Sequence, residues 1–595
     1  MKTRAMRLMS TLMIALCIAP PLAGRAETFP PNGWKESPNP IASPLAIPGG
    51  MITVFGGQYP NSLNYYLDNN TFTSQVFGAM YDALLTLDPL TLDYQPGLAS
   101  KWSISDDKLT YTFTLNPDAR WSDGKPITAH DVAWTFQAIL NPKNLTGSHK
   151  VSLERFHPPI VKDDHTIVFT ARSLHWSNLG TVGGFNILPA HAFKDLNFNE
   201  INFNFPVISG PYRLGTITEG ISILMERRKD NWNRNAPSMQ HTGNFQTIRY
   251  KFFADRINAF EAFKKGEIDI YPVYTSRLWV NQTSGPRFQN NYIVKQKVIN
   301  RQPVGFQGFA MNMRKFPFDD IRVRKAMAHL LDRKKMNQTL MYGQYFLHRS
   351  YMEDLYNADT PCTNPVFDFN KEKARKLLAD AGFKVNPKTG ILEKNGRALA
   401  FDFLARDSTA DKFLAIFSED LKDVGIRLRI VQKDWAAWVK DMETFNYQMT
   451  WAAWSSGVFK DPEGMWASSE ADRQNGNNIT GFKHPAVDAL IEKQKGIFDV
   501  AARNAINRKI DRIVSDAVPY VLLWNINATR LLYWNKFGTP DTVLSKYGRE
   551  ESAFWYWWFD PDAEMDLRDA MAENAPLPPL PSTIRFDEQF KPLNR

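Results

Sequence analysis

The segment 98–140 constrains the fold of this chain more than any other, because three kinds of local pattern follow one another in it. Within 109–115, apolar residues alternate with threonines, which is the period-2 pattern of a strand with one buried face. An Asp-Gly pair at 123–124 marks a turn. Thr128 and Asp131 then form a capping box, and apolar residues at helical spacing follow it. Strand, turn and helix in this order predict a mixed α/β domain.

The first 26 residues have the three parts of a secretory signal peptide. Basic residues precede an apolar run at 8–22, and small residues before the end of the segment suit a signal peptidase. The run is too short to span a membrane. A lipid anchor on Cys17 is not expected, because a leucine precedes it and the apolar run continues beyond it. We therefore expect a soluble protein that leaves the cytoplasm, with 1–26 removed and 27–49 as a Pro- and Gly-rich extension.

Charge and cysteine content exclude some classes of protein. Removal of 1–26 lowers the formal net charge from +9 to +5, and the basic residues are interspersed with acidic ones, so no nucleic-acid partner is expected. Cys362 becomes the one cysteine left, which rules out an intramolecular disulfide. It lies in a turn-rich loop without a neighbouring basic residue or histidine, so we interpret it as a structural or incidental thiol rather than a nucleophile.

No catalytic or metal motif is found in the sequence. The zinc-protease, serine-hydrolase and phosphate-loop patterns are all missing, and the 10 histidines are scattered singly. His130 and Asp131 form the most tempting acid/base pair, but both lie in the first turn of the predicted helix, where Asp131 has a capping role. We expect no cofactor, no metal and no enzyme activity.

Five blocks of sequence, in order, resemble the extracellular solute-binding proteins of the peptide and nickel transporter family. They include 98–140, the Ser-Gly-Pro-Tyr turn at 209–212 and the helix-forming stretch 306–343. The resemblance covers about 50–540. The segments 531–538 and 554–558 look most like the YejA-type peptide-binding members.

The resemblance implies an α/β fold of the periplasmic binding protein type II, cluster C-like, with two mixed α/β lobes and an extra domain hinged around a ligand cleft. Lobe I is expected to comprise 50–75, 206–305 and 522–565, the extra domain 76–205, and lobe II 306–521. The remaining 566–595 are expected to form a C-terminal tail that lies along the surface or stays loose.

The same resemblance implies where a ligand is held. Trp435 and Trp451 match positions at which oligopeptide-binding members present tryptophans to the peptide, and simple core packing is the alternative. Such members carry an aspartate where this chain has Trp454, so the ligand's amino terminus is held differently or the ligand is not a plain linear peptide. Asp461 is a candidate replacement, although it also reads as a turn residue. The expected ligand-binding residues are Trp435, Trp451, Trp454, Ser455, Ser456, Asp461, Tyr66, Asn69, Phe309 and Tyr351.

The function implied is that of the periplasmic substrate-binding component of an ABC importer, a monomer that delivers an oligopeptide or peptide-like ligand to a membrane permease. Two alternatives stay open. One is an oligosaccharide ligand in the same fold, since stacked tryptophans also suit sugar rings. The other is a secreted hydrolase with an unrecognised site.

Overall fold

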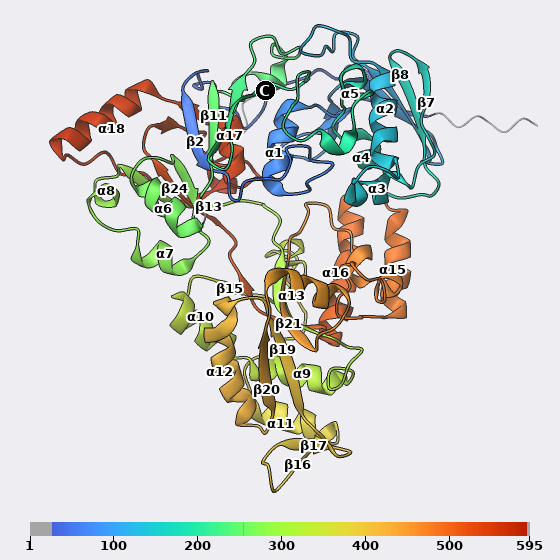
Figure 1. Ribbon diagram of the computed structural model, residues 1–595, viewed down its shortest axis with the longest axis vertical. Coiled ribbons are helices and arrows are strands. Elements are labelled where there is room, and N and C mark those ends of the chain that lie inside the picture. The colour runs from blue at the N-terminus through green and yellow to red at the C-terminus, as the bar shows by residue number, and fades with distance from the viewer. Residues whose placement is uncertain (1–25, 254, 592–595) are drawn as a thin grey trace, which may run out of the picture.

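The computed structural model describes residues 26–253 and 255–591, so the predicted signal peptide lies outside the described residues except for Ala26. Three large sheets organise the rest (Figure 1). The first has eight strands, and we call the part of the chain built on it lobe I. Its strands, in spatial order, are β27 (Thr583–Arg585), β13 (Ile293–Ile299), β24 (Thr529–Trp534), β12 (Ile270–Pro272), β2 (Met51–Phe55), β11 (Thr247–Lys251), β10 (Ser222–Arg227) and β9 (Tyr212–Thr218).

The second sheet belongs to the extra domain and contains the segment that most constrained the sequence analysis. The predicted strand is β6, and the capping box of Thr128 and Asp131 begins the predicted helix. The sheet order is β1 (Glu27–Phe29), β5 (Ala99–Ile104), β6 (Thr110–Leu115), β8 (Thr166–Thr170) and β7 (Ile160–Asp163). Its helices are α2 (Ala129–Leu140), α3 (Gly147–Leu153), α4 (Asn178–Gly183) and α5 (Ala190–Phe193).

The third sheet builds lobe II, from strands that all fall between residues 306 and 522. Its order is β20 (Arg427–Gln432), β19 (Ala400–Ala405), β21 (Met449–Trp454), β14 (Phe306–Met311) and β22 (Tyr520–Leu522). Its helices are α9 (Ile321–Leu330), α10 (Arg333–Met341), α11 (Lys371–Asp380), α12 (Asp411–Lys422), α13 (Trp435–Glu443), α14 (Glu463–Trp466), α15 (Pro485–Lys495) and α16 (Val500–Ala517).

The hydrophobic cores group these three units into two bodies. One continuous cluster of buried side chains joins lobe I to the extra domain and includes Ile52 at 0% exposure in one and Phe113 at 0% in the other. The buried clusters that contain Phe309 and Phe306 draw all their residues from lobe II. Because a shared close-packed core transmits displacement, lobe I and the extra domain are expected to move together, and lobe II against them.

Both ends of the described chain add strands to sheets. Strand β1 pairs antiparallel with β5 at the edge of the extra-domain sheet. The helix α18 (Pro561–Glu573) runs into the predicted C-terminal tail, and β27 then pairs in parallel with β13, so the tail extends the sheet of lobe I rather than only lying on it. The Pro-rich composition did not reveal this pairing, which depends on the exposed edge of a strand almost 300 residues earlier.

Candidate functional site

The chain crosses between lobe I and lobe II twice, at 300–305 and at 525–528 (Figure 1). Asn525 donates its Nδ2 to the carbonyl of Gly305 at 2.8 Å, which ties one crossing to the other. Asn300 donates to the carbonyls of Ser545 and Gly548 at 2.6 and 2.7 Å, which fixes the first crossing to lobe I. Two adjacent crossings of this kind define a hinge axis for the lobes.

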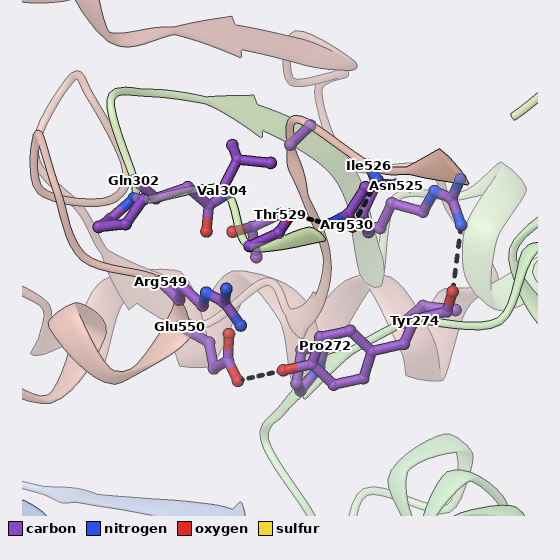
Figure 2. Close-up of a pocket in the computed structure, with 14 residues that line it drawn as sticks. Pro272, Tyr274, Gln302, Val304, Asn525, Ile526, Thr529, Arg530, Arg549 and Glu550 are labelled. Carbon is purple, nitrogen blue, oxygen red and sulfur yellow. Dashed lines mark hydrogen bonds between the residues drawn. The ribbon is translucent and has the colours of Figure 1, made fainter. Parts of the chain in front are cut away.

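A pocket of about 90 Å³, which we call the hinge pocket, opens between the two crossings and lobe I (Figure 2). Tyr274, which follows β12, donates its hydroxyl to Oε1 of Glu550 at 2.8 Å. The carbonyl of Tyr274 accepts the hydroxyl of Tyr345 from lobe II at 2.9 Å. Burial and the Glu550 carboxylate raise the pKa of Tyr274, so it is a hydrogen-bond donor at neutral pH.

A wider hollow of about 690 Å³ lies beside the hinge pocket and shares Gln302, Pro303 and Val304 with it. Both bodies contribute to its lining, with Leu92 from the extra domain and Tyr547 from lobe I on one side. Cavities of this size hold small organic ligands. The residues that line it from lobe II include Phe346, Tyr356, Phe459 and Lys460.

Lys460, a charged residue that lines this hollow, is held in place by hydrogen bonds and an ion pair. The Lys460 side chain is 5% exposed, and its ammonium donates to Oγ of Ser456 at 2.6 Å and to the carbonyl of Gly457 at 2.8 Å. It also pairs with the carboxylate of Asp354. The predicted residue Ser456 therefore contacts a lining residue of the hollow, while its neighbour Ser455 is exposed to solvent.

Four of the predicted ligand-binding residues are engaged in packing within lobe II. Trp451 donates Nε1 to Oε1 of Gln307 at 3.0 Å, and its ring meets those of Phe309 and Trp524 with centroids 5.7 and 5.9 Å apart. Phe309 is fully buried. The other two are Trp454 and Tyr351. Trp454 donates Nε1 to the Tyr520 hydroxyl at 3.1 Å, and Tyr351 is 5% exposed.

Trp435 differs from these residues because 60% of it is exposed. It lies at the start of α13, stacks on the buried Trp438 at a centroid distance of 5.2 Å, and has the Arg406 guanidinium 5.5 Å from its ring. One face of the indole is thus supported and the rest is free to contact another molecule.

The two residues predicted in lobe I lie in different surroundings. Tyr66 is 3% exposed and donates its hydroxyl to the carbonyl of Asn186, with its ring against Phe77. Asn69 is exposed just before α1 (Thr71–Met80). None of Tyr66, Asn69, Trp435 and Trp451 lines the hinge pocket or the hollow, so their role in ligand binding stays a prediction.

Sequence reasoning did not single out Tyr274, Gln302, Asn525 or Glu550, which line the hinge pocket. Tyr274 follows β12, Gln302 and Asn525 come from the two crossings, and Glu550 begins a short 3-10 helix near the C-terminal end. The available signal was the polar residues Gln302 and Asn525 at both predicted lobe junctions, where a chain that only had to connect two cores would not need them.

The extra domain meets lobe II in a second contact region, on the far side of the crossings (Figure 1). The backbone N–H of Trp176 donates to the carbonyl of Lys495 at 2.9 Å. The Arg503 guanidinium lies 4.2 Å from the Trp176 ring centroid, and the Trp176 ring packs against Phe459 with centroids 6.2 Å apart. In Figure 1, α15 and α16 of lobe II stand directly beneath α3 and α4 of the extra domain.

His175, Asp461 and Glu463 gather in this second region with potential ligand atoms within 4.8 Å of one another. Metal binding through Nε2 of His175 requires a lone pair there. The backbone N–H of Ser177 donates to Nδ1 of His175 at 3.1 Å, which puts the proton of the neutral ring on Nε2. Glu463 already pairs with Lys495 at 2.7 Å. The proton on Nε2 of His175 and the pairing of Glu463 with Lys495 therefore do not fit a metal centre.

The residues that might have supported catalysis are also accounted for. Asp131 accepts the backbone N–H groups of Thr128 and Ala190, each at 2.9 Å, as a helix cap does. Burial raises the pKa of Cys362, which is opposite to the shift of an activated thiol. In the part of the chain that the structure describes, no helix has the length and apolar character needed to cross a membrane.

A family model for bacterial extracellular solute-binding proteins, family 5, matches residues 93–476. The chain belongs to this family. That match confirms the family resemblance inferred from the sequence. The two-lobed α/β architecture is that of the type II periplasmic binding proteins, as expected.

Among similar proteins, the probable peptide-binding protein YejA of Agrobacterium fabrum is 29% identical over 520 residues, which cover 79% of this chain and 83% of that protein. The peptidoglycan-binding protein YepA of the same organism is 26% identical over 505 residues, covering 77% and 81%. The oligopeptide-binding protein AppA of Bacillus subtilis, solved with a nonapeptide, aligns with a TM-score of 0.67 at 22% identity, covering 86% of this chain and 99% of AppA.

Proposed function

We propose that this protein is the periplasmic substrate-binding component of an ABC importer, and that it encloses an oligopeptide or peptide-like ligand between lobe I and lobe II. The observation that carries the proposal is the pair of cores joined by two short crossings, with a hollow of about 690 Å³ lined by both bodies. A ligand that contacts both bodies favours their closed arrangement, and release follows opening.

The polar and aromatic lining suits peptide chemistry. Peptide backbones need hydrogen-bond donors and acceptors, while side chains of varied shape need room and apolar contact. The hinge pocket offers the Tyr274–Glu550 pair, and the hollow offers Phe346, Tyr356 and Phe459. The relatives described as peptide-binding, and the match to a peptide complex, support this ligand class.

Localisation and partners follow from the same proposal. The predicted signal peptide directs the chain to the periplasm, where a monomer delivers its ligand to a permease in the inner membrane. Binding without chemical change accounts for a site built from packed aromatic residues and satisfied ion pairs.

A panel of short synthetic peptides tests the proposal directly. Isothermal titration calorimetry of the mature protein should show saturable binding of some peptides, and mass spectrometry of the mixture should recover them intact. Oligosaccharides form the second arm of the panel. Cleaved peptides would favour a secreted hydrolase, and binding confined to oligosaccharides would favour the sugar alternative.

A fragment of peptidoglycan is the second candidate, because one relative is described as peptidoglycan-binding. Such a ligand combines sugar rings with a short peptide, which would use an exposed tryptophan face as well as the polar pocket. Trp435→Ala removes that face, and it should weaken a muropeptide by about 1–2 kcal/mol while leaving a plain peptide unaffected. Equal weakening of both ligands would assign Trp435 to peptide binding instead.

A further inference from the structure

The contact between the extra domain and lobe II joins parts of two bodies that have separate cores. The loop 173–177 of the extra domain supplies one side, and the segments 459–463 and 495–503 of lobe II supply the other. No shared hydrophobic cluster lies beneath this contact within the described residues. A rotation about the crossings would therefore separate its two sides without unfolding either body.

The loop is held rigidly on its own side, independently of lobe II. Asn178 donates Nδ2 to the carbonyl of Ser173 at 2.9 Å, and Arg155 donates to Oγ of Ser177 and to Oγ1 of Thr181, each at 3.2 Å. A rigid loop pays little ordering entropy when it docks. It presents Trp176 to lobe II, where the ring meets Phe459 and the Arg503 guanidinium.

We propose that the loop 173–177 is a clasp that docks on lobe II only in the closed form and holds the lobes together over the ligand. Trp176 is its main anchor. The Arg503 guanidinium faces the indole ring, and the backbone bond from Trp176 to Lys495 fixes the register of the two surfaces. The clasp proposal rests on the proposed function in one respect, which is that closure of the lobes retains a ligand.

His175 makes the clasp sensitive to protonation. Its side chain is 4% exposed, and its Nε2 has no hydrogen-bond partner and lies 3.9 Å from Oδ2 of Asp461. The charged groups that face the ring are Arg155 from the extra domain and Asp461, Glu463 and Lys495 from lobe II.

Burial is the largest cause that lowers the pKa of His175, and Arg155 and Lys495 lower it further against the opposing effect of the two carboxylates. Opening would expose the ring and remove the burial that lowers its pKa, so the open form binds protons more readily than the closed form. The closed form therefore loses stability relative to the open form as pH falls, and the clasp releases in acid.

Crosslinking tests the clasp without knowledge of the ligand. A β-carbon placed on Gly496 of lobe II would lie 3.4 Å from Cδ2 of Leu174. In a Cys362→Ser background, Leu174→Cys with Gly496→Cys should be joined by a short bismaleimide. Leu145→Cys with Gly496→Cys is the matched control, because Leu145 is an exposed residue elsewhere on the same domain.

Adding Trp176→Ala should lower the crosslinking yield about fivefold, the effect of losing a partly desolvated cation–π contact. Trp176→Phe should restore much of the yield. Trp134→Ala, a half-buried tryptophan of the extra domain away from lobe II, should leave the yield unchanged. Equal yields with and without Trp176, or a yield in the Leu145 pair as high as in the Leu174 pair, would overturn the clasp.

At each pH, the crosslinking yield of the parent pair is compared with that of the same pair carrying His175→Gln. This comparison corrects for the change in thiol reactivity with pH. The parent pair should lose yield relative to that variant below about pH 6.5. His130→Gln, an exposed histidine of the same domain, should keep the parent profile. A yield that instead rises with zinc and falls with chelator would assign His175, Asp461 and Glu463 to a metal and overturn protonation as the trigger.

The two proposals fail in different ways. If the protein binds no peptide in the panel and the crosslink at the clasp still forms, the proposed function is contradicted and the clasp is not. Peptide binding with no effect of Trp176 on either affinity or crosslinking would contradict the clasp alone.

Discussion

The hinge and the clasp, two regions where lobe II contacts the rest of the described chain, are built from different interactions. At the hinge, hydrogen bonds run to main-chain carbonyls, such as Tyr345 to Tyr274 and Arg530 to Gln344 at 2.8 Å. At the clasp, an indole, a guanidinium and a buried imidazole carry the contact. The hydrogen bonds at the hinge lie beside the two chain crossings and shift little when the lobes rotate. At the clasp, the two surfaces have to separate. Because the clasp has to break each time the lobes open, it depends on few groups. Protonation of one of them, His175, can control it.

The largest expected effect lies at the hinge. Arg530 is 3% exposed and its guanidinium lies over the Tyr345 ring at 5.0 Å while bonding to the Gln344 carbonyl. Arg530→Ala should lower the free energy of unfolding by about 3 kcal/mol, because it leaves the half-buried Gln344 carbonyl unpaired and a cavity behind. Urea unfolding measures this change. The control is Arg549→Ala, which removes an exposed arginine beside the same pocket. An equal loss of unfolding free energy in the two variants would contradict a special role for the buried Arg530.

A smaller effect is expected from a single neutral hydrogen bond across the hinge. Tyr345→Phe removes the bond to the Tyr274 carbonyl and keeps the ring that faces Arg530. The free energy of unfolding should fall by about 1 kcal/mol. The pH dependence of crosslinking at the clasp should not change. If it does, the hinge and clasp are coupled more tightly than their separate contacts imply.

The smallest effect is the protonation of His175. Burial lowers the pKa of His175 in the closed form, so protonation in acid favours the open form and disfavours closure. The penalty grows as pH falls further. Ligand affinity measured by calorimetry between pH 8 and pH 5 should decline in the wild type and decline less in His175→Gln. A wild-type affinity that rises in acid would reverse the assigned sign.

Local patterns in the sequence predicted much of the fold. The capping box of Thr128 and Asp131, the strand at β6 and the helix begun by Asp320 all depend on neighbours within a few residues. Apolar residues at helical spacing over 73–85 predict one helix, but the helix ends at Met80, where the next residue takes an extended backbone and the chain turns into β3 (Leu85–Leu87). Periodicity alone does not mark that end, because the buried Leu84 and Leu85 continue the apolar pattern of Val76 and Phe77.

The candidate site was less predictable because it depends on contacts between distant segments. Trp435 and Trp451 are the same residue type in one lobe, yet the first is largely exposed and the second packs between Phe309 and Trp524. Nothing in their immediate sequence separates these cases. The clasp was also invisible, since Trp176 and Arg503 lie more than 300 residues apart and neither belongs to a motif.

The pairing of β27 with β13 has a practical consequence for handling the protein. Residues 583–585 form the outermost strand of the eight-stranded sheet and cover the edge of β13. A recombinant chain that stopped before residue 580 would leave the backbone groups of 297–299 open to another molecule, and such edges recruit neighbouring chains into intermolecular sheets. Purification tags are therefore better placed at the mature N-terminus, and truncation at the proline-rich stretch should yield aggregates rather than a trimmed monomer.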